Sequence, residues 1–254
     1  MSHDHPDGLA RMNALAGEIV SAADYLALPN LRPRDAAALI LIDRTGPSAK
    51  VLLGRRHEGH AFMPGKFVFP GGRLEPADQR MPAEATLDRE AERKLLLAVR
   101  RPSAAYARAL ALAAIRETYE ETGLLLGRVR HEVVDVPAGP WAAFAAARVL
   151  PDLSALHFVA RAITPPRRPR RFDTRFFAAD AGAIAHRVDG MIAPDAELVE
   201  LRWMPIAAAR ELDMPAITAV VLQELELRIA GGLRHSMPVP FYRMQHGRFV
   251  RELL

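Results

Sequence analysis

Short apolar runs bounded by turn-forming residues predict most of the elements of this chain. The run 35–42 is followed by a turn around Gly46-Pro47 and a second apolar run at 50–56, a pattern typical of a β-hairpin. Further apolar or alternating runs predict strands over 67–69, 156–163, 172–177 and 197–203. Longer mixed runs predict helices over 9–28, 82–99, 206–212 and 216–231.

The longest apolar run, 104–115, leads into an acidic segment. Ser103 is a suitable N-cap for a helix, and Gly123 is a suitable C-terminal stop. Within that helix Glu117 and Glu121 are four residues apart and Glu117 and Glu120 three apart, so the three carboxylates share one face.

This acidic face lies in the last turn of the predicted helix, where negative charge is unfavourable. Like charges at this spacing repel by a few tenths of a kcal/mol, and the helix dipole opposes negative charge in the last turn. A hard divalent cation such as Mg²⁺ would offset that repulsion, because it binds carboxylate oxygens. The alternative is a solvated acidic helix end with Arg116 and Glu120 as a surface ion pair, and the segment taken alone leaves both open.

A second segment, Phe69–Asp78, makes the pattern more specific. Together the two segments resemble the signature of the Nudix hydrolase superfamily, which reads Gly, five residues, Glu, seven residues, then Arg-Glu-aliphatic-x-Glu-Glu-x-Gly. The matching residues here are Gly72, Asp78, Arg116, Glu117, Glu120, Glu121 and Gly123. Asp78 replaces Glu, Thr118 replaces an aliphatic residue, and the seven-residue gap has grown to the 37 residues 79–115.

The resemblance implies an α/β fold, the Nudix α/β/α sandwich with a mixed central sheet. We expect one domain over 1–254 with a helical insertion at about 79–103. We expect the helix 82–99 to extrude from the core, to shape the substrate mouth and to supply no metal ligand. Long insertions cost little loop-closure entropy, so the core survives this one.

A subfamily pattern lies at 52–72. Leu52, Leu53, Arg56, Gly65 and 69–72 resemble the motif of the coenzyme A diphosphatase branch, although Ala61 stands where that motif has a second Arg. The sequences at 62–72 and 171–177 also resemble those of the acyl-CoA diphosphatase branch, whose members carry a long insertion in the Nudix motif.

The composition limits the chemistry, the location and the partners that we expect for this protein. The chain has 254 residues and no Cys, which excludes disulfides and thiolate chemistry. A polar start and the lack of a long apolar stretch lead us to expect a cytoplasmic protein without a membrane partner. The net charge of +4 suits an anionic small-molecule substrate, or reflects genomic composition alone. No basic stripe interleaved with aromatic residues indicates a specific nucleic acid. The oligomeric state stays open, a homodimer included.

The resemblance also implies roles for single residues. Glu117 and Glu121, with Glu120, would bind Mg²⁺ or Mn²⁺, and Glu120 or the later Glu197 would accept the proton of the attacking water. Arg116 would orient a carboxylate. The candidate substrate-binding residues are Arg56, Arg73, Gly71 and Gly72. Each has an ordinary alternative: exposed structural arginines, and glycines of a tight turn.

The basic loop 167–171 is a further candidate, either for a 3′-phosphate of the substrate or as a solvated charge run. Two classes of function remain. The first is a metal-dependent hydrolase of a nucleoside diphosphate linked to another moiety, of CoA or acyl-CoA type or another such as ADP-ribose or NADH. The second is a non-catalytic Nudix-fold binding or regulatory module.

Overall fold

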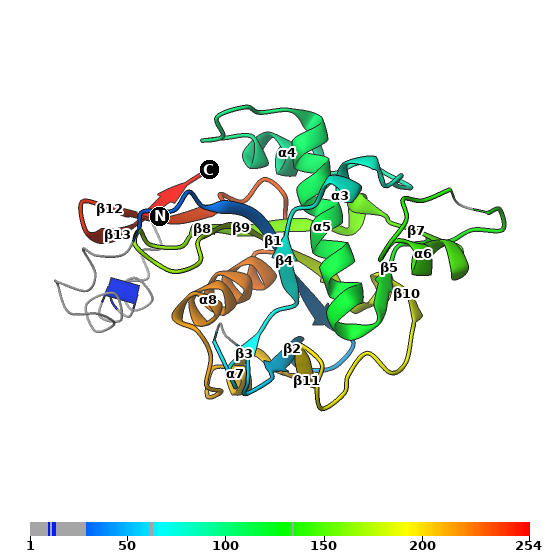
Figure 1. The fold of residues 1–254 in the computed structure, drawn as a ribbon. Coiled ribbons are helices and arrows are strands. Elements are labelled where there is room, and N and C mark those ends of the chain that lie inside the picture. The colour runs from blue at the N-terminus through cyan, green and yellow to red at the C-terminus, as the bar shows by residue number, and fades with distance from the viewer. Residues whose placement is uncertain (1–9, 11, 14–28, 61–62, 134) are drawn as a thin grey trace.

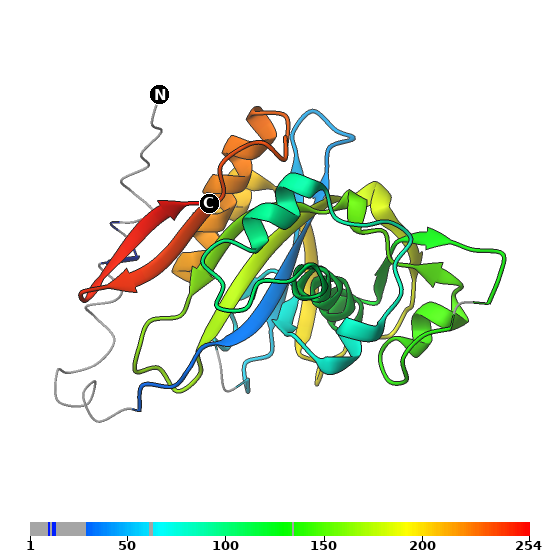
Figure 2. The ribbon, with the colours of Figure 1, turned by 90° about the horizontal axis from the view of Figure 1, so that it is seen from above.

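The computed structural model describes the chain except for residues 1–9, 11, 14–28, 61–62 and 134. Most of the helix expected over 9–28 therefore lies outside the described residues. A nine-stranded mixed sheet crosses the molecule, and α-helices lie on both of its faces (Figures 1 and 2). This arrangement confirms the expected α/β sandwich with a mixed sheet.

The helices are α3 Pro76–Arg80, α4 Arg89–Leu95, α5 Ala104–Thr122, α6 Ala142–Ala146, α7 Ile206–Ala209 and α8 Ala216–Ala230. The strands of the main sheet are β1 Arg34–Asp43, β2 Lys50–Arg56, β3 Phe67–Val68, β4 Gly71–Arg73, β8 His157–Ile163, β9 Phe172–Asp180, β11 Leu198–Pro205, β12 Pro240–Gln245 and β13 Arg248–Leu253. Two small sheets pair β5 Leu124–Leu126 with β10 Ile184–Arg187, and β6 Arg128–Val129 with β7 Val149–Leu150.

Strand β1 lies in the middle of the sheet and is buried over nearly its whole length. Successive side chains of a strand point to opposite faces, so Leu39 and Leu41 join one core cluster while Ile40 and Ile42 join the other. Helix α5 covers the first face and α8 the second, as Figure 2 shows. A near-continuous apolar run is the sequence pattern of a strand covered on both faces.

The main sheet has the order β11-β2-β1-β9-β8-β12-β13, with β3 added to β2 and β4 to β1. The predicted hairpin of β1 and β2 is antiparallel, whereas β1 and β9 are parallel from Arg34 and Phe172 onward. Because β4 pairs with the start of β1 and α5 packs on the same strand, the two halves of the signature are held against β1.

Helix α5 begins and ends where the sequence predicts. The Ser103 side chain accepts a hydrogen bond from the Tyr106 backbone N–H at 3.1 Å, which caps the N-terminus. At the other end Gly123 has φ of 76°, and a side chain there would collide with the backbone of Val188. The acidic segment therefore closes the helix at a sharp and well-defined stop.

The insertion differs from expectation. The helix predicted over 82–99 is only the seven-residue α4, which begins after Asp88, whose carboxylate accepts from the N–H groups of Glu90 and Ala91. The segment does not extrude either. Four apolar side chains of the insertion are buried in the core that α5 shares, and they are Met81, Leu87, Ala91 and Leu95. Burial of these four side chains attaches the insertion to the core, although most of its other residues are polar or charged.

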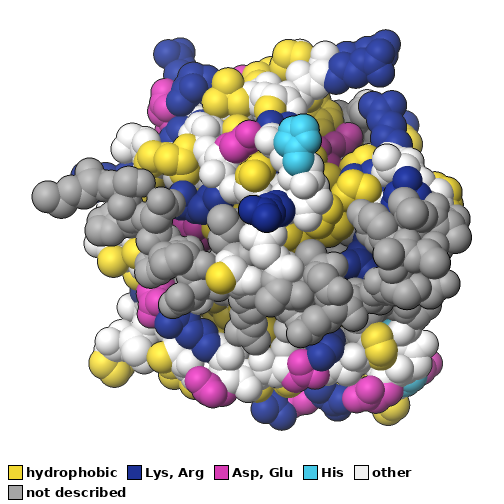
Figure 3. All heavy atoms as spheres, turned by 90° about the vertical axis from the view of Figure 1, so that its left-hand side faces the viewer, with side chains coloured by type: hydrophobic (Ala, Val, Ile, Leu, Met, Phe, Trp, Pro, Cys, Tyr) yellow, Lys and Arg dark blue, Asp and Glu magenta, His cyan; other side chains and the backbone are white. Residues whose placement is uncertain are grey.

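The chain after α8 forms a hairpin, β12 and β13, for which we predicted no element. Its turn contains His246 and Gly247, both with positive φ, the geometry of two-residue hairpin turns. Helix α7 is also shorter than expected and ends at Ala209. On the face drawn in Figure 3, the described basic side chains are scattered among acidic and hydrophobic ones. No helix in the described part of the chain has the length and apolar character needed to cross a membrane.

Candidate active site

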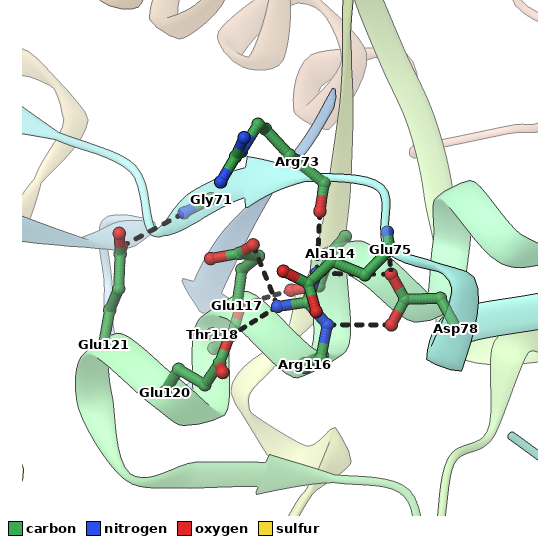
Figure 4. A network of polar contacts seen from close by, with 10 residues as sticks. All are labelled: Gly71, Arg73, Glu75, Asp78, Ala114, Arg116, Glu117, Thr118, Glu120 and Glu121. Carbon is green, nitrogen blue, oxygen red and sulfur yellow. Dashed lines mark hydrogen bonds and ion pairs between the residues drawn. The ribbon is translucent and has the colours of Figure 1, made fainter. Parts of the chain in front are cut away.

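Strand β4 and the C-terminal half of α5 form the centre of the site. The backbone N–H of Gly71 donates a hydrogen bond of 3.1 Å to the Glu121 carboxylate (Figure 4). Gly71 and Gly72 were expected in a turn, but they lie in a strand with neither φ positive. They are small for another reason, since a side chain at Gly71 would collide with β1 and one at Gly72 with the Glu117 carboxylate.

Arg116 connects the carboxylates around it (Figure 4). Its Nη1 donates to Glu117 at 2.9 Å and to Glu120 at 2.5 Å, while its Nη2 donates to the Arg73 carbonyl at 2.7 Å. The side chain is almost fully buried. The surface ion pair that the sequence left open is therefore not what the structure contains. Arg116 instead fixes the orientation of two carboxylates and of β4.

Asp78 is the fourth partner of Arg116. Its carboxylate accepts from Arg116 Nε at 2.8 Å and also from the backbone N–H of Glu75, which holds the start of α3. Asp78 and Arg116 flank the insertion, so this fully buried ion pair closes it at its base. The shorter Asp that replaces the usual Glu thus acts as an anchor for Arg116.

The second departure from the signature also has a local account. Thr118 is buried, and its hydroxyl donates to the carbonyl of Ala114 within α5 at 2.8 Å. A buried hydroxyl needs such a partner. Thr118 therefore fills the aliphatic position without leaving a polar group unsatisfied.

A further carboxylate reaches the site from a distant part of the sequence. Glu197 precedes β11, which pairs with β2, and its carboxylate forms an ion pair with Arg56. His60 lies beside both, with Nε2 3.1 Å from Arg56 Nη2 and 3.6 Å from Glu197 Oε1. Its four-residue spacing from Arg56 is the only sequence signal for this contact.

The three glutamates of α5 are partly or fully buried and close to one another, so their ionised forms are disfavoured. Burial raises the pKa of Glu117 to about 7, with Glu120 and Glu197 adding to the rise against the attraction of Arg116. Burial, followed by the charges of Glu197 and Glu117, raises the pKa of Glu121 well above its usual range. Burial likewise raises the pKa of Glu120. The carboxylates of the neighbouring residues more than offset the burial of Arg116, so its pKa is raised as well.

These residues fit a divalent cation by their chemistry. Their oxygen donors are the kind that Mg²⁺ binds, and a cation beside Glu117 and Glu121 would offset the burial and the repulsion that raise both pKa values. Among the described residues, however, no three acidic or histidine side chains already converge on one point. Arg116 holds Glu117 and Glu120, and Arg56 holds Glu197.

The remaining predicted residues lie at the edges of the site. The exposed side chain of Arg73 lines a large cavity at the end of β4. In the basic loop, Arg171 donates to Asn30 at 2.8 Å and to the carbonyls of Leu31 and Thr164. Arg171 thus braces the loop against the segment before β1.

The fold of this chain is similar to that of known proteins. No family model matches the chain. A Nudix hydrolase from Alicyclobacillus acidocaldarius is similar in structure, with 29% sequence identity, a TM-score of 0.59, and coverage of 78% of this chain and 96% of that one. This similarity supports a Nudix hydrolase enzyme.

Other Nudix structures show weaker likeness. The Nudix domain of NrtR from Shewanella oneidensis, complexed with ADP-ribose, has 14% identity and a TM-score of 0.43 over 83% of this chain and 99% of that one. An Ap4A hydrolase from C. elegans has 14% identity and a TM-score of 0.40 over 78% and 99%. Nudix hydrolases cleave diphosphate bonds of nucleoside diphosphates linked to another moiety, and they generally use divalent metal ions.

Proposed function

We propose that this Nudix hydrolase is a Mg²⁺-dependent diphosphatase whose substrate is of the CoA or acyl-CoA type. The observation that carries the proposal is that Glu117 and Glu121 lie against β4 and that Glu197 lies near enough to interact with both charges, although the three carboxylates do not meet at one point among the described residues. They come from two distant parts of the chain, and Glu197 raises the pKa of both helix carboxylates.

The carboxylates and the strand have separate tasks in diphosphate hydrolysis. Glu117 and Glu121, with Glu120 behind them, would hold Mg²⁺, which when bound neutralises phosphate charge and acidifies a water molecule. Because Gly71 and Gly72 have no side chains, β4 can pack closely against β1 and against the Glu117 carboxylate, which keeps the strand beside the carboxylates. Arg116 keeps Glu117 and Glu120 aimed through its fixed hydrogen bonds.

Glu197 is the candidate for accepting the proton of the attacking water. Its side chain is about half exposed, at 45%, and is the most accessible of the clustered carboxylates, so water and substrate reach it readily. The Arg56 guanidinium donates a hydrogen bond to it and would also be a suitable partner for a phosphate oxygen of the substrate. Glu120 is the alternative base, although its bond to Arg116 ties it to an orienting role.

The choice of a CoA-type substrate rests on the pattern at 52–72. In the structure this segment is β2, β3 and β4, which borders the carboxylates directly. The replacement of the second motif Arg by Ala61 removes one phosphate contact. Because this motif residue is missing, ADP-ribose and NADH are retained as alternative substrates.

A substrate panel tests this proposal. Product release from CoA, an acyl-CoA, ADP-ribose and NADH is measured with Mg²⁺ and with a chelator in its place. We expect CoA or the acyl-CoA to give the highest kcat/KM, with 3′,5′-ADP and a phosphopantetheine as products, and no turnover with chelator. A clear preference for ADP-ribose or NADH would reject the CoA assignment. Absence of turnover on every substrate would favour the non-catalytic binding module.

A further inference from the structure

A large cavity outside the carboxylate cluster is lined by arginines. Its volume is about 1060 Å³, and its walls come from the segment before β1, the end of β4, the end of the insertion, the start of α5, and strands β8 and β9. Seven arginines and three carboxylates line it, a formal excess of four positive charges. The whole chain of 254 residues carries the same net charge.

Five of these arginines form the open part of the wall, all with exposed side chains. None of the five is paired with a carboxylate of any residue that the structure describes, and they are Arg32, Arg34, Arg73, Arg100 and Arg101. Like charges gathered around one cavity repel unless an anion lies between them. A guanidinium also matches the geometry of phosphate oxygens.

The other two arginines form a rigid floor. Arg161 binds Asp173 through Nε and Nη2 at 2.8 and 2.7 Å. Arg175 donates to Asp35 at 2.8 Å, and the Tyr106 hydroxyl donates to the same carboxylate. Both acids of the floor are thus committed to these arginines. Charges fixed in this way are pre-organised for a ligand.

One donor of that floor has no partner. Arg175 is 1% exposed, and its Nε is buried without a hydrogen bond to any described group. A buried donor left unsatisfied is costly, so a ligand oxygen that reached it would remove a penalty. This donor and the open arginines are independent observations that indicate an anionic ligand.

The cavity is adjacent to the carboxylate cluster through β4. Arg73 contributes its side chain to the cavity, while its carbonyl accepts from Arg116 (Figure 4). Gly71, at the other end of this three-residue strand, binds Glu121. Strands rise about 3.3 Å per residue, so the two sites are about 7 Å apart along β4. One extended nucleotide derivative can reach both.

The insertion supplies one wall. Arg161 Nη1 donates to the carbonyls of Leu97 and Ala98 at 3.0 and 3.3 Å, which fixes the chain just before Arg100 and Arg101. The cavity thus depends on the segment that separates the two halves of the Nudix signature.

We propose that this cavity binds a phosphomonoester group of the substrate that is not cleaved, while the diphosphate lies at the carboxylates. The inference rests on the proposed diphosphatase function and names the part of the substrate that the insertion recognises. It also moves that recognition away from the loop 167–171, where Arg171 is engaged in bracing the chain.

Binding without metal tests the site separately from catalysis. Calorimetry in the presence of a chelator compares adenosine 3′,5′-bisphosphate with adenosine 5′-monophosphate. We expect the bisphosphate to bind about tenfold more tightly, the effect of one charge-assisted phosphate contact. The double variant Arg100→Gln/Arg101→Gln should lose most of this difference. The matched control Arg80→Gln/Arg89→Gln removes two exposed charges outside the cavity lining and should keep it.

Kinetics test the link to the substrate. We expect kcat/KM for CoA to exceed that for dephospho-CoA by about tenfold, and this ratio to fall toward one in Arg100→Gln/Arg101→Gln. Equal affinity for the two nucleotides would overturn the phosphate site. A binding preference with equal rates for CoA and dephospho-CoA would overturn its assignment to the substrate. The binding preference without hydrolysis of any substrate would support the phosphate site and contradict the diphosphatase function alone.

Discussion

At the scale of single residues, Arg116 and Asp78 are the pair on which the site depends. Both side chains are almost completely buried, and they join two segments 38 residues apart. A buried charge that loses its partner is strongly destabilising, whereas an exposed ion pair contributes little. The same bond orients Arg116 toward Glu117 and Glu120, so stability and activity should change together here.

Replacement of Asp78 by Asn tests this coupling. We expect Asp78→Asn to lower the free energy of unfolding by about 2–4 kcal/mol, measured by denaturant titration, and to lower kcat as well. The matched control is Asp180→Asn, which breaks the half-exposed pair with Arg44 and should cost less than about 1 kcal/mol. Similar losses for the two variants would mean that the buried pair has no special role.

The raised pKa of Glu117 predicts a pH dependence of stability. Its carboxyl binds a proton more tightly in the folded state, with a pKa of about 7, than in the unfolded chain, where the value is 4.5. Metal-free protein should therefore lose stability as pH rises from about 4.5 to 7. Glu117→Gln removes this loss, so its stability relative to the unmodified protein should grow over that range, by about 1–3 kcal/mol.

Denaturant titrations in chelator between pH 5 and 7.5 measure the effect. Exposed Glu132→Gln serves as the control and should show no such trend. A stability difference for Glu117→Gln that stays constant with pH would contradict the raised pKa.

At the scale of elements, the sequence predicts what local signals specify. Ser103 and Gly123 mark the ends of α5 because capping is a property of the residues beside the helix. The signature likewise predicted the acidic face. The path of the insertion could not be read in this way, since four apolar side chains among many charges decide it through contacts with α5.

The site was predictable to a similar extent. Its helix follows from the sequence, whereas β4 was expected as a turn, and the ion pair of Arg56 with Glu197 depends on the pairing of β2 with β11, across 141 residues. The hairpin of β12 and β13 was missed although His246-Gly247 is a turn signal, because its strands carry many polar residues.

The insertion gives a test at this scale. Leu95 lies in α4 and is 1% exposed, so Leu95→Ala should destabilise the protein by about 2–4 kcal/mol. Leu97, two residues later and 36% exposed, is the control, and Leu97→Ala should cost less than about 1 kcal/mol. Thermal and denaturant unfolding measure both. Equally small effects of Leu95→Ala and Leu97→Ala would indicate that the insertion lies outside the core.

At the scale of the whole molecule, two kinds of charge lie near the two ends of β4. The Glu121 carboxylate is bound at Gly71, and the arginine-lined cavity begins at Arg73. A substrate with a diphosphate and a further phosphate would use both. The carboxylate end is the one on which hydrolysis depends, so it carries the central claim.

The most direct test of that claim is the initial rate of diphosphate hydrolysis as a function of Mg²⁺ concentration. It is measured on the best substrate of the panel for the unmodified protein, Glu121→Gln, Glu120→Gln and the control Glu132→Gln. We expect saturable dependence on Mg²⁺ for the unmodified protein and the control. Glu121→Gln and Glu120→Gln should lower kcat by at least about 10²-fold at saturating Mg²⁺ while remaining folded. Near-normal turnover of Glu121→Gln, or hydrolysis that persists in chelator, would contradict the account.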